Sequence, residues 1–296
     1  MTDISPLFGR VAIIGIGLIG SSLARALVEY RLAQEVVCAD RSAEACAKAM
    51  ELGIVATATT DLADALEGSE LVVLATPVGS FAEVGERIGP HLRPGTIVTD
   101  VGSVKQAVLR DVGPHIPAGV HLIPGHPVAG TEHSGPESGF ATLFEGRWCI
   151  LTPPPAANPE AVAKVEEMWR RVGSKVELME ANHHDRVLAI TSHLPHLIAY
   201  TIVGTASDLE ESTQSEVIKF SAGGFRDFTR IAASDPIMWR DIFLNNREAV
   251  LEVLQRFTED LTALQRAIRW GEGQHLQDHF TKTRAIRRGI IDARQA

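Results

Sequence analysis

Runs of four or five consecutive apolar residues alternate with amphipathic stretches through residues 1–180 of the chain. Such short runs are typical of strands that are buried on both faces, and the stretches between them have the periodicity of helices that cover a sheet. The predicted strands lie at 11–14, 36–39, 71–75, 96–99, 120–123, 148–152 and 175–178. This alternation predicts an α/β, Rossmann-type, doubly wound parallel sheet, and an antiparallel strand at one edge is also compatible with it.

The pattern changes near Ala181, where the strand signals stop and helical periodicity takes over. One apolar seam repeats at alternating spacings of four and three residues, as in a coiled coil. Its members are Val250, Leu254, Phe257, Leu261, Leu264 and Ile268. The seam fits either packing inside an all-α domain or a contact between subunits. We expect two domains, 1–180 and 181–296, and a homodimer formed through the second, all-α domain.

Length, charge and cysteine content exclude several classes of protein. A chain of 296 residues is about twice the length of a typical domain, in agreement with two domains. The net charge of -9 provides no basic field to attract phosphates, which argues against nucleic acid or an anionic membrane as a partner. Cys38, Cys46 and Cys149 are too few and too scattered for a disulfide framework or a zinc knuckle. Without a basic leader or an apolar stretch of about 18 residues, we expect a soluble, cytoplasmic protein.

A glycine-rich turn, GIGLIG from Gly15 to Gly20, follows the first predicted strand and opens a helix. In this strand–turn–helix setting the GxGxxG spacing is typical of dinucleotide binding. Gly15 permits the tight turn, Gly17 lets a pyrophosphate approach the backbone, and Gly20 lets the helix pack on the strand. The helix begins near Leu18 and Ile19, where free N–H groups and partial positive charge face the phosphates. The sequence therefore predicts a dinucleotide site in the first domain.

Asp40 ends the second predicted strand, twenty residues after Gly20. A carboxylate at this place accepts a hydrogen bond from the adenine-ribose 2′-hydroxyl and repels a 2′-phosphate, which favours NAD over NADP. Arg41 leaves NADP open, because a guanidinium beside that position can accept the phosphate. Thr76 and Pro77 end the third predicted strand, at the edge of the sheet where a nicotinamide ribose would lie. These four residues extend the predicted cofactor site, to which Ser103 also belongs.

Ser103 lies between the fourth predicted strand and a helix. With Gln106 three residues later it fits a capping box, whereas a catalytic role at the cofactor edge fits the position equally well. The two interpretations are compatible, because a serine at a helix cap also lies at the cofactor edge. Lys105 is interpreted as a solvated helix residue, with a cofactor contact as the alternative.

His126 lies just past the predicted strand 120–123, in a loop that reads GHPVAGTE. Ligands of open parallel sheets collect at the carboxyl ends of the strands. A neutral imidazole there, with an ordinary pKa of about 6.5, can accept a proton at neutral pH. By itself such a glycine- and proline-rich loop is more often a plain turn, so the interpretation depends on the neighbouring segments.

Three polar segments stand out in the helical half. Pro195 predicts a break in a helix, with His196 beside the kink. A glycine loop runs into a helix that carries Arg226 and Arg230, and an arginine beside such a loop in an acidic protein is suited to bind a carboxylate. The segment 234–236, Ser-Asp-Pro, is typical of a helix start, with serine or aspartate as the cap.

Five segments together resemble the prephenate dehydrogenase family, which includes arogenate and cyclohexadienyl dehydrogenases. They are GIGLIGSSLARAL, DVGSVK, GHPVAGTEHSG, SHLPH and GGFRDFTRIAASDPIMWRDIF, and the last three are the most specific. The resemblance spans nearly the whole chain and implies a Rossmann domain followed by a helical dimerisation domain. It also implies NAD-dependent oxidative decarboxylation of prephenate to 4-hydroxyphenylpyruvate, or of arogenate to tyrosine, in tyrosine biosynthesis. No residue distinguishes the two substrates.

The same resemblance implies roles for individual residues. His126 matches the catalytic histidine that hydrogen-bonds the substrate's C4 hydroxyl, and Ser103 matches the serine that orients this histidine and touches the nicotinamide. Arg230 matches the arginine that binds a substrate carboxylate. Glu132 matches a glutamate that gates access, while Arg226 replaces a lysine of some relatives and so changes the geometry of any substrate contact. The substrate-binding residues implied besides Arg230 are His196, Thr131, Glu132, Trp239, Arg226 and Gly223.

Two other classes of protein fit part of the pattern. β-Hydroxyacid-type dehydrogenases also join a Rossmann domain to helices, but they use a lysine of the helical domain. Lys219 and Lys282 are the only lysines after residue 180, and neither stands in that setting. A non-catalytic NAD-sensing dimer explains the glycine turn and the apolar seam but gives no reason for His126 with Arg230. A metal site is not expected, because HExxH spacing is absent from the histidines His183, His184, His193 and His196.

Overall fold

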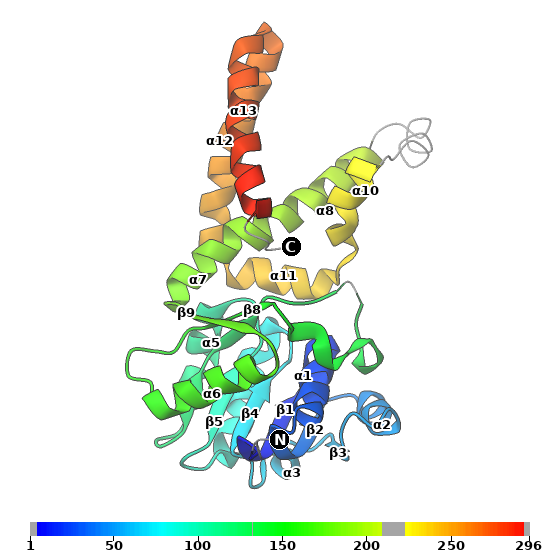
Figure 1. Ribbon diagram of the computed structural model, residues 1–296, viewed down its shortest axis with the longest axis vertical. Coiled ribbons are helices and arrows are strands. Elements are labelled where there is room, and N and C mark those ends of the chain that lie inside the picture. The colour runs from blue at the N-terminus through cyan, green and yellow to red at the C-terminus, as the bar shows by residue number, and fades with distance from the viewer. Residues whose placement is uncertain (1–4, 132, 209–222, 293–296) are drawn as a thin grey trace. The chain divides into compact units, whose positions relative to one another are not determined.

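The computed structural model describes residues 5–131, 133–208 and 223–292 (Figure 1). The chain forms two compact units, Met1–Arg247 and Glu248–Ala296. The first unit contains the sheets and the helices that precede residue 247. The change from strands to helices at Ala181 therefore lies inside this unit. Asp185, just after that point, accepts hydrogen bonds from the backbone of Lys105 and Gln106 in the strand-rich part.

Six parallel strands form the main sheet, in the order β3-β2-β1-β4-β5-β6. They are β1 (Phe8–Ile14), β2 (Ala33–Ala39), β3 (Thr57–Thr59), β4 (Leu71–Leu74), β5 (Ile97–Asp100) and β6 (His121–Ile123). The strands expected up to residue 123 are confirmed. The edge strand β3 was not predicted, because three residues reading Thr-Ala-Thr give no apolar run. The strand order reverses between β1 and β4, and such a switch point is where open α/β sheets bind ligands.

Six helices cover both faces of this sheet, and all of them except the last also connect its strands. They are α1 (Leu18–Glu29), α2 (Ala43–Glu51), α3 (Leu62–Leu66), α4 (Phe81–Ile88), α5 (Lys105–Asp111) and α6 (Pro159–Arg171). The residues of β1 alternate between two apolar clusters, with Val11 and Ile13 in one and Ala12 and Ile14 in the other. Burying a valine or isoleucine side chain contributes about 1.5–3 kcal/mol to the stability of the fold. Because β1 buries apolar side chains on both of its faces, helices are stabilised on both faces of the sheet.

Three further strands form a separate small sheet, in the order β7-β8-β9. They are β7 (Gly125–Pro127), β8 (Trp148–Leu151) and β9 (Lys175–Leu178), and β7 runs antiparallel to β8 whereas β9 runs parallel to it. The expectation of one sheet with an antiparallel edge is therefore wrong in this detail. The loop expected around His126 is wrong as well, because Gly125 and His126 pair with Leu151 and Ile150. Pro127 ends the strand, as a residue without an N–H does.

The helical part of the first unit begins with one continuous run. It comprises α7 (Ala181–Leu188), a π-helical turn (Ala189–His193) and α8 (Leu194–Ser207). The break predicted at Pro195 is not observed. The proline lies in the first turn of α8, where its lack of an N–H is tolerated, and the wider π-helical turn lies directly before it. Two shorter helices follow, α10 (Gly223–Thr229) and α11 (Pro236–Asn245). Asp235 caps α11 by accepting from the Met238 N–H at 2.7 Å, so this predicted helix start is confirmed.

Among the described residues, the run 181–207 is long and apolar enough to cross a membrane by length and composition alone, which the sequence analysis did not anticipate. It nevertheless carries His184, Asp185 and His193, which are 0%, 4% and 1% exposed. These groups are hydrogen-bonded to other residues of the first unit. Buried polar groups with hydrogen-bond partners of this kind occur where a helix packs against a protein core, and 22% of the apolar window of this run is buried.

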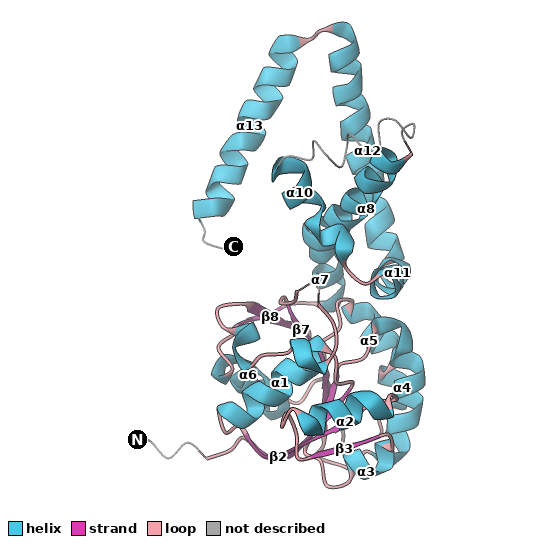
Figure 2. Ribbon diagram, turned by 90° about the vertical axis from the view of Figure 1, so that its right-hand side faces the viewer, coloured by secondary structure: helices cyan, strands magenta, loops and turns pink. Residues whose placement is uncertain are grey.

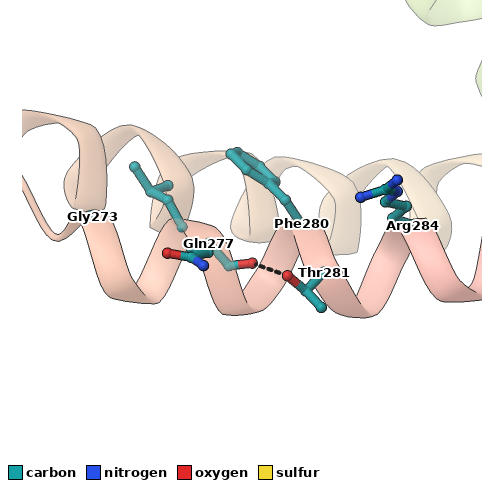
Figure 3. A pocket seen from close by; sticks show the side chains of 6 residues that line it. Gly273, Gln277, Phe280, Thr281 and Arg284 are labelled. Carbon is teal, nitrogen blue, oxygen red and sulfur yellow. Dashed lines mark hydrogen bonds between the residues drawn. The ribbon is translucent and has the colours of Figure 1, made fainter.

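The second unit is built from two long helices, α12 (Arg247–Trp270) and α13 (Gly273–Asp292), seen in Figure 2. Gly271 between them has φ +69°, the left-handed conformation that commonly ends a helix. The helix predicted over the apolar seam is confirmed, and Leu261 and Ile268 of that seam are 53% and 66% exposed. A shallow hollow runs along α13 (Figure 3), lined by Gly273, Leu276, Gln277, Phe280, Thr281 and Arg284.

Candidate active site

The glycine turn between β1 and α1 has the geometry that a bound pyrophosphate requires. Gly15 has φ +99°, and a Cβ there would lie 2.7 Å from the Ala75 carbonyl oxygen. A Cβ at Gly20 would lie 2.1 Å from the Gly15 carbonyl oxygen, so helix and strand could not pack as closely with a side chain there. A Cβ at Gly17 would meet no atom within 4 Å, which leaves open space over the backbone. No side chain caps α1 at Gly17, so the first turn, including Leu18 and Ile19, faces that space with its N–H groups.

Asp40 lies directly after β2 and is tied to the glycine turn. Its Oδ2 accepts the Ile16 N–H at 3.0 Å and its Oδ1 accepts the Ser42 N–H at 2.9 Å. Each carboxylate oxygen keeps a second lone pair, which can accept a hydroxyl proton. Arg41 beside it is exposed. The structure thus holds a carboxylate at the edge of the turn where a ribose would lie.

At the end of β4, Thr76 is half-buried and Pro77 is exposed. The Ser80 hydroxyl donates to Thr76 Oγ1 at 3.0 Å and contacts the Pro77 carbonyl oxygen at 2.7 Å. These contacts fix the turn that follows the strand. Thr76 and Pro77 therefore lie, as expected, at the carboxyl edge of the main sheet.

His126 on β7 is 7% exposed and is the first member of a buried chain of hydrogen bonds. Its Nδ1 lies 2.8 Å from His184 Nε2, and His184 Nδ1 lies 2.8 Å from Asp185 Oδ1. Burial lowers the pKa of His126 well below its ordinary value of 6.5, and His184 and Lys105 lower it further. Burial also lowers the pKa of His184, although the hydrogen bond to Asp185 opposes this shift. Both imidazoles are therefore neutral at pH 7.

Lys105 is not the solvated residue that its helical position predicted. It is 0% exposed, and its ammonium donates to the Asp100 carboxylate and to the Gly125 carbonyl oxygen. Asp100 also accepts the Gly125 N–H at 3.1 Å and the Gly102 N–H at 2.7 Å. Burial lowers the pKa of Lys105 from its ordinary value. The pair holds both polar groups of Gly125 and so fixes the backbone next to His126.

The capping box predicted from Ser103 and Gln106 is absent. Val104 is the N-cap of α5, and no side chain of that position bonds the helix. The cap comes from α7 instead, because Asp185 Oδ1 accepts the Lys105 N–H at 2.8 Å and Oδ2 accepts the Gln106 N–H at 2.9 Å. A carboxylate bonding two N–H groups at a helix N-terminus is also favoured by the helix dipole. Ser103 itself is half-buried between β5 and α5.

A second cluster joins α8 to α11. The His196 ring stacks on Trp239, with ring centroids 3.6 Å apart, and the His193 ring meets Trp239 edge-on at 6.0 Å. Asn246 Nδ2 lies 3.0 Å from His193 Nδ1 and donates to the Asp185 carbonyl oxygen at 2.8 Å. Burial lowers the pKa of His193 to about 4. Asn246 therefore links this cluster to the chain that ends at His126.

Three of the remaining predicted residues lie on α10 and the turn that follows it. Burial lowers the pKa of His196, and the nearby charge of Arg230 lowers it as well. Arg230 itself is exposed and begins the 3-10 turn Arg230–Ala233. Arg226 on α10 is 78% exposed at its side chain and lies 3.8 Å from Asp227 Oδ1. Gly223 is the first residue of α10.

Two further predicted residues belong to the segment after β7. Thr131 is exposed, and its hydroxyl oxygen accepts the His133 N–H at 3.3 Å. Glu132 lies outside the described residues. The structure thus stacks His196 on Trp239, whereas Arg226 and Arg230 are both exposed.

Sequence reasoning missed Asp185 and Asn246, and it considered His184 only as a metal ligand. All three are buried polar residues without a local motif. One feature of the sequence points to them. His184 and Asp185, four and five residues after the helix-capping Glu180, lie on the helix face that also carries the buried Ala181 and Leu188. Polar residues on an apolar face require partners, which is a reason to search for them.

Comparison with known proteins gives similarity over nearly the whole chain. Two family models match, "Prephenate dehydrogenase, nucleotide-binding domain" over residues 23–178 and "Prephenate dehydrogenase, dimerization domain" over residues 180–282. The cyclohexadienyl dehydrogenase of Zymomonas mobilis is 41% identical over 281 residues, which cover 95% of this chain and 96% of that protein.

Solved structures agree with these matches. The prephenate dehydrogenase of Aquifex aeolicus, in complex with hydroxyphenyl propionate and NAD+, has a TM-score of 0.90 and 34% identity, covering 98% of this chain and 100% of that one. The arogenate dehydrogenase of Synechocystis has a TM-score of 0.77 and 29% identity, covering 93% and 99% of the two chains.

Proposed function

The chain belongs to the prephenate dehydrogenase family, and from this premise we propose that it oxidises and decarboxylates prephenate to 4-hydroxyphenylpyruvate in tyrosine biosynthesis. The protein is an NAD-dependent oxidoreductase. The observation that carries the proposal is His126, a buried and neutral imidazole whose Nδ1 is bound by His184. Neither a β-hydroxyacid-type dehydrogenase nor a non-catalytic NAD-sensing dimer accounts for the full-length similarity.

The glycine turn fits the cofactor. The open space at Gly17 and the uncapped start of α1 suit a pyrophosphate, and Asp40 suits the hydroxyls of the adenine ribose. Bound NAD+ supplies an acceptor for the hydride that leaves C4 of the substrate ring. We assign Thr76, Pro77 and Ser103 to the nicotinamide side of the site, and we infer a preference for NAD over NADP from Asp40, with Arg41 available to a phosphate.

His126 is assigned as the general base. The hydroxyl on C4 loses its proton to His126 as the C4 oxygen becomes a ketone. The bond between C1 and its carboxylate then breaks, CO2 leaves, and the electron pair makes the ring aromatic. The phenolate oxygen takes the proton back from His126, so the histidine is regenerated. General-base catalysis of this kind contributes about 10²- to 10⁴-fold to the rate.

Arg230 is assigned as the anchor of a substrate carboxylate. Prephenate is a dianion, and the protein has a net charge of -9, so a local cation is needed to hold it. A hydrogen bond to a charged group contributes about 1.5–3 kcal/mol. His196 stacks on Trp239 and feels the charge of Arg230, and we assign these two rings to the wall of the substrate site. We place Gly223, Arg226, Thr131 and Glu132 at its border.

Arogenate is the second candidate substrate, because it differs from prephenate only in carrying an amine in place of the side-chain ketone. The test is NADH formation and CO2 release by the purified protein with prephenate and with arogenate, each with NAD+ and NADP+. The proposal expects the highest kcat/KM with prephenate and NAD+. Absence of turnover with both substrates would reject it, and a clear preference for arogenate would correct the substrate.

We propose further that the chain is a soluble, cytoplasmic homodimer formed through residues 181–296. Large apolar side chains that are exposed on the single chain support this, namely Ile190, Ile202, Val203, Leu244, Leu251, Leu261, Ile268, Phe280 and Ile286. Apolar surface on this scale is typical of subunit interfaces. The match of this region to a dimerization-domain family agrees with it. Light scattering after size-exclusion chromatography tests it, and a monomer at micromolar concentration would overturn it.

A further inference from the structure

Two residues of α7, His184 and Asp185, lie behind the assigned base, and neither belongs to the motifs that identify the family site above. We propose that they are positioning residues that select the tautomer of His126, placing its proton on Nδ1 and leaving Nε2 as the basic nitrogen. The inference rests on the proposed function for its kinetic readout only.

The Asp185 carboxylate binds both the start of α5 and the ring of His184. Its oxygens accept the backbone N–H groups of Lys105 and Gln106, which are donors under all conditions. Both oxygens of this carboxylate therefore act as hydrogen-bond acceptors. His184 Nδ1 lies 2.8 Å from the same Oδ1 that binds Lys105. Because that oxygen can only accept, His184 Nδ1 must carry the proton.

The next link is His184 Nε2. Burial lowers the pKa of His184, so the ring is neutral and carries one proton, on Nδ1. Its Nε2 therefore has a lone pair and accepts. His126 Nδ1 lies 2.8 Å from this nitrogen and must be the donor. A neutral His126 with its proton on Nδ1 has its lone pair on Nε2, the nitrogen that the substrate hydroxyl requires.

The groups around His126 disfavour its protonated form, so Asp185 and His184 are needed to stabilise it when it accepts a proton. His126 faces His184 from α7, Lys105 from α5 and His193 from the π-helical turn, and each of these lowers its pKa. Asp100 faces Lys105 rather than His126, and burial keeps the Cys149 thiol on β8 protonated by raising its pKa well above the ordinary value. When His126 takes a proton, the anion that offsets the new charge is Asp185, acting through His184.

Asn246 fixes the whole assembly from the other side. Its amide donates to the Asp185 carbonyl oxygen and contacts His193 Nδ1. The end of α11 therefore fixes the backbone of α7 at the residue whose side chain binds α5. In many enzymes an aspartate orients a catalytic histidine by a direct hydrogen bond. Here the imidazole of His184 lies between Asp185 and His126.

The tautomer can be read directly from the ¹⁵N shifts of imidazole-labelled protein, with His126→Asn used to assign the signals of His126. The wild-type enzyme without substrate is expected to show a protonated Nδ1 and an unprotonated Nε2 for His126. His184→Leu is expected to lose this preference. A His126 protonated on Nε2 in the wild type would overturn the inference, whether or not the enzyme turns over prephenate.

Kinetics give the second readout. His184→Leu leaves the Asp185 cap on α5 in place, and it is expected to lower kcat about 10²-fold, with KM for prephenate changed less than about threefold. His183→Gln is the matched control, because His183 is the exposed neighbour on the same helix, and it should keep wild-type kcat. Asp185→Asn should lower kcat similarly. If His184→Leu folds, keeps the wild-type tautomer of His126 and keeps its kcat, the two residues are structural only.

Discussion

The backbone N–H of Lys105 donates to Asp185 Oδ1 at 2.8 Å, across 80 residues of sequence. This bond joins the first turn of α5, in the nucleotide-binding part, to α7, at the start of the helical part. The same oxygen lies 2.8 Å from His184 Nδ1. One carboxylate therefore caps a helix and orients the chain of imidazoles that reaches His126, so the packing of the two parts and the chemistry of the site depend on a shared residue.

Replacement of the assigned base should affect turnover and not binding. His126→Asn keeps a polar side chain of similar size but cannot accept the substrate proton. We expect kcat to fall by about 10²- to 10⁴-fold, with little change in KM for prephenate. Steady-state kinetics at saturating NAD+ measure both constants. Wild-type turnover by this variant at saturating prephenate would show that the base is another group.

The pH dependence of the wild-type enzyme follows from the lowered pKa of His126. The base acts in its neutral form, so kcat/KM falls when the histidine becomes protonated. Because burial and neighbouring groups hold this pKa well below 6.5, the acid side of the profile should lie well below pH 6.5 and activity should be flat from there to neutrality. A profile of kcat/KM with an inflection at or above pH 6.5 would contradict this assignment.

The sequence was most informative where geometry is local. Gly15, Gly17 and Gly20 could be assigned separate roles because a tight turn, an open approach and a close helix contact each depend on residues within the motif. The structure has the matching geometry at all three positions. The apolar runs likewise predicted the strands up to residue 123 except the edge strand β3, because strands that are buried on both faces require apolar side chains at nearly every position.

The sequence was least informative where a contact depends on distant residues. Lys105 starts a helix, and the pattern around it gives no sign of the Asp100 and Gly125 groups that bury it. Asp185 caps α5 from another helix, so no local spacing could reveal it. His126 was identified as a candidate, but its strand was not, because β7 exists only by pairing with Cys149, Ile150 and Leu151 of β8.

Cofactor preference should respond to the carboxylate after β2. Asp40→Asn removes the charge that repels a 2′-phosphate and weakens the hydrogen bond to the ribose hydroxyl. We expect kcat/KM with NAD+ to fall roughly tenfold and the ratio of NAD+ to NADP+ use to fall further, since a charged hydrogen bond contributes about 1.5–3 kcal/mol. Arg41→Ala is the companion variant and should reduce use of NADP+ only. An unchanged cofactor ratio in Asp40→Asn would place the discrimination elsewhere.

The assigned anchor should act on binding. Arg230→Ala removes the cation that offsets a substrate carboxylate, and KM for prephenate should rise about tenfold or more. Arg226→Ala is the companion variant, because it removes the same charge four residues earlier, at a side chain that we place only at the border of the site and that is 78% exposed. Its KM should change much less. If Arg230→Ala leaves KM unmoved, or if Arg226→Ala has the larger effect, the carboxylate is held by a different residue.

Stability should depend on the buried pair beneath the base. Lys105→Met leaves the Asp100 carboxylate without its cation in a site that is 0% exposed. Removing one partner of a buried ion pair costs about 3–5 kcal/mol, so we expect a clear fall in the free energy of unfolding, measured by urea denaturation. The double variant Asp100→Asn with Lys105→Met removes the stranded charge and should recover part of the loss. A single variant as stable as the wild type, or a double variant less stable than the single one, would show that the pair is not held as charges.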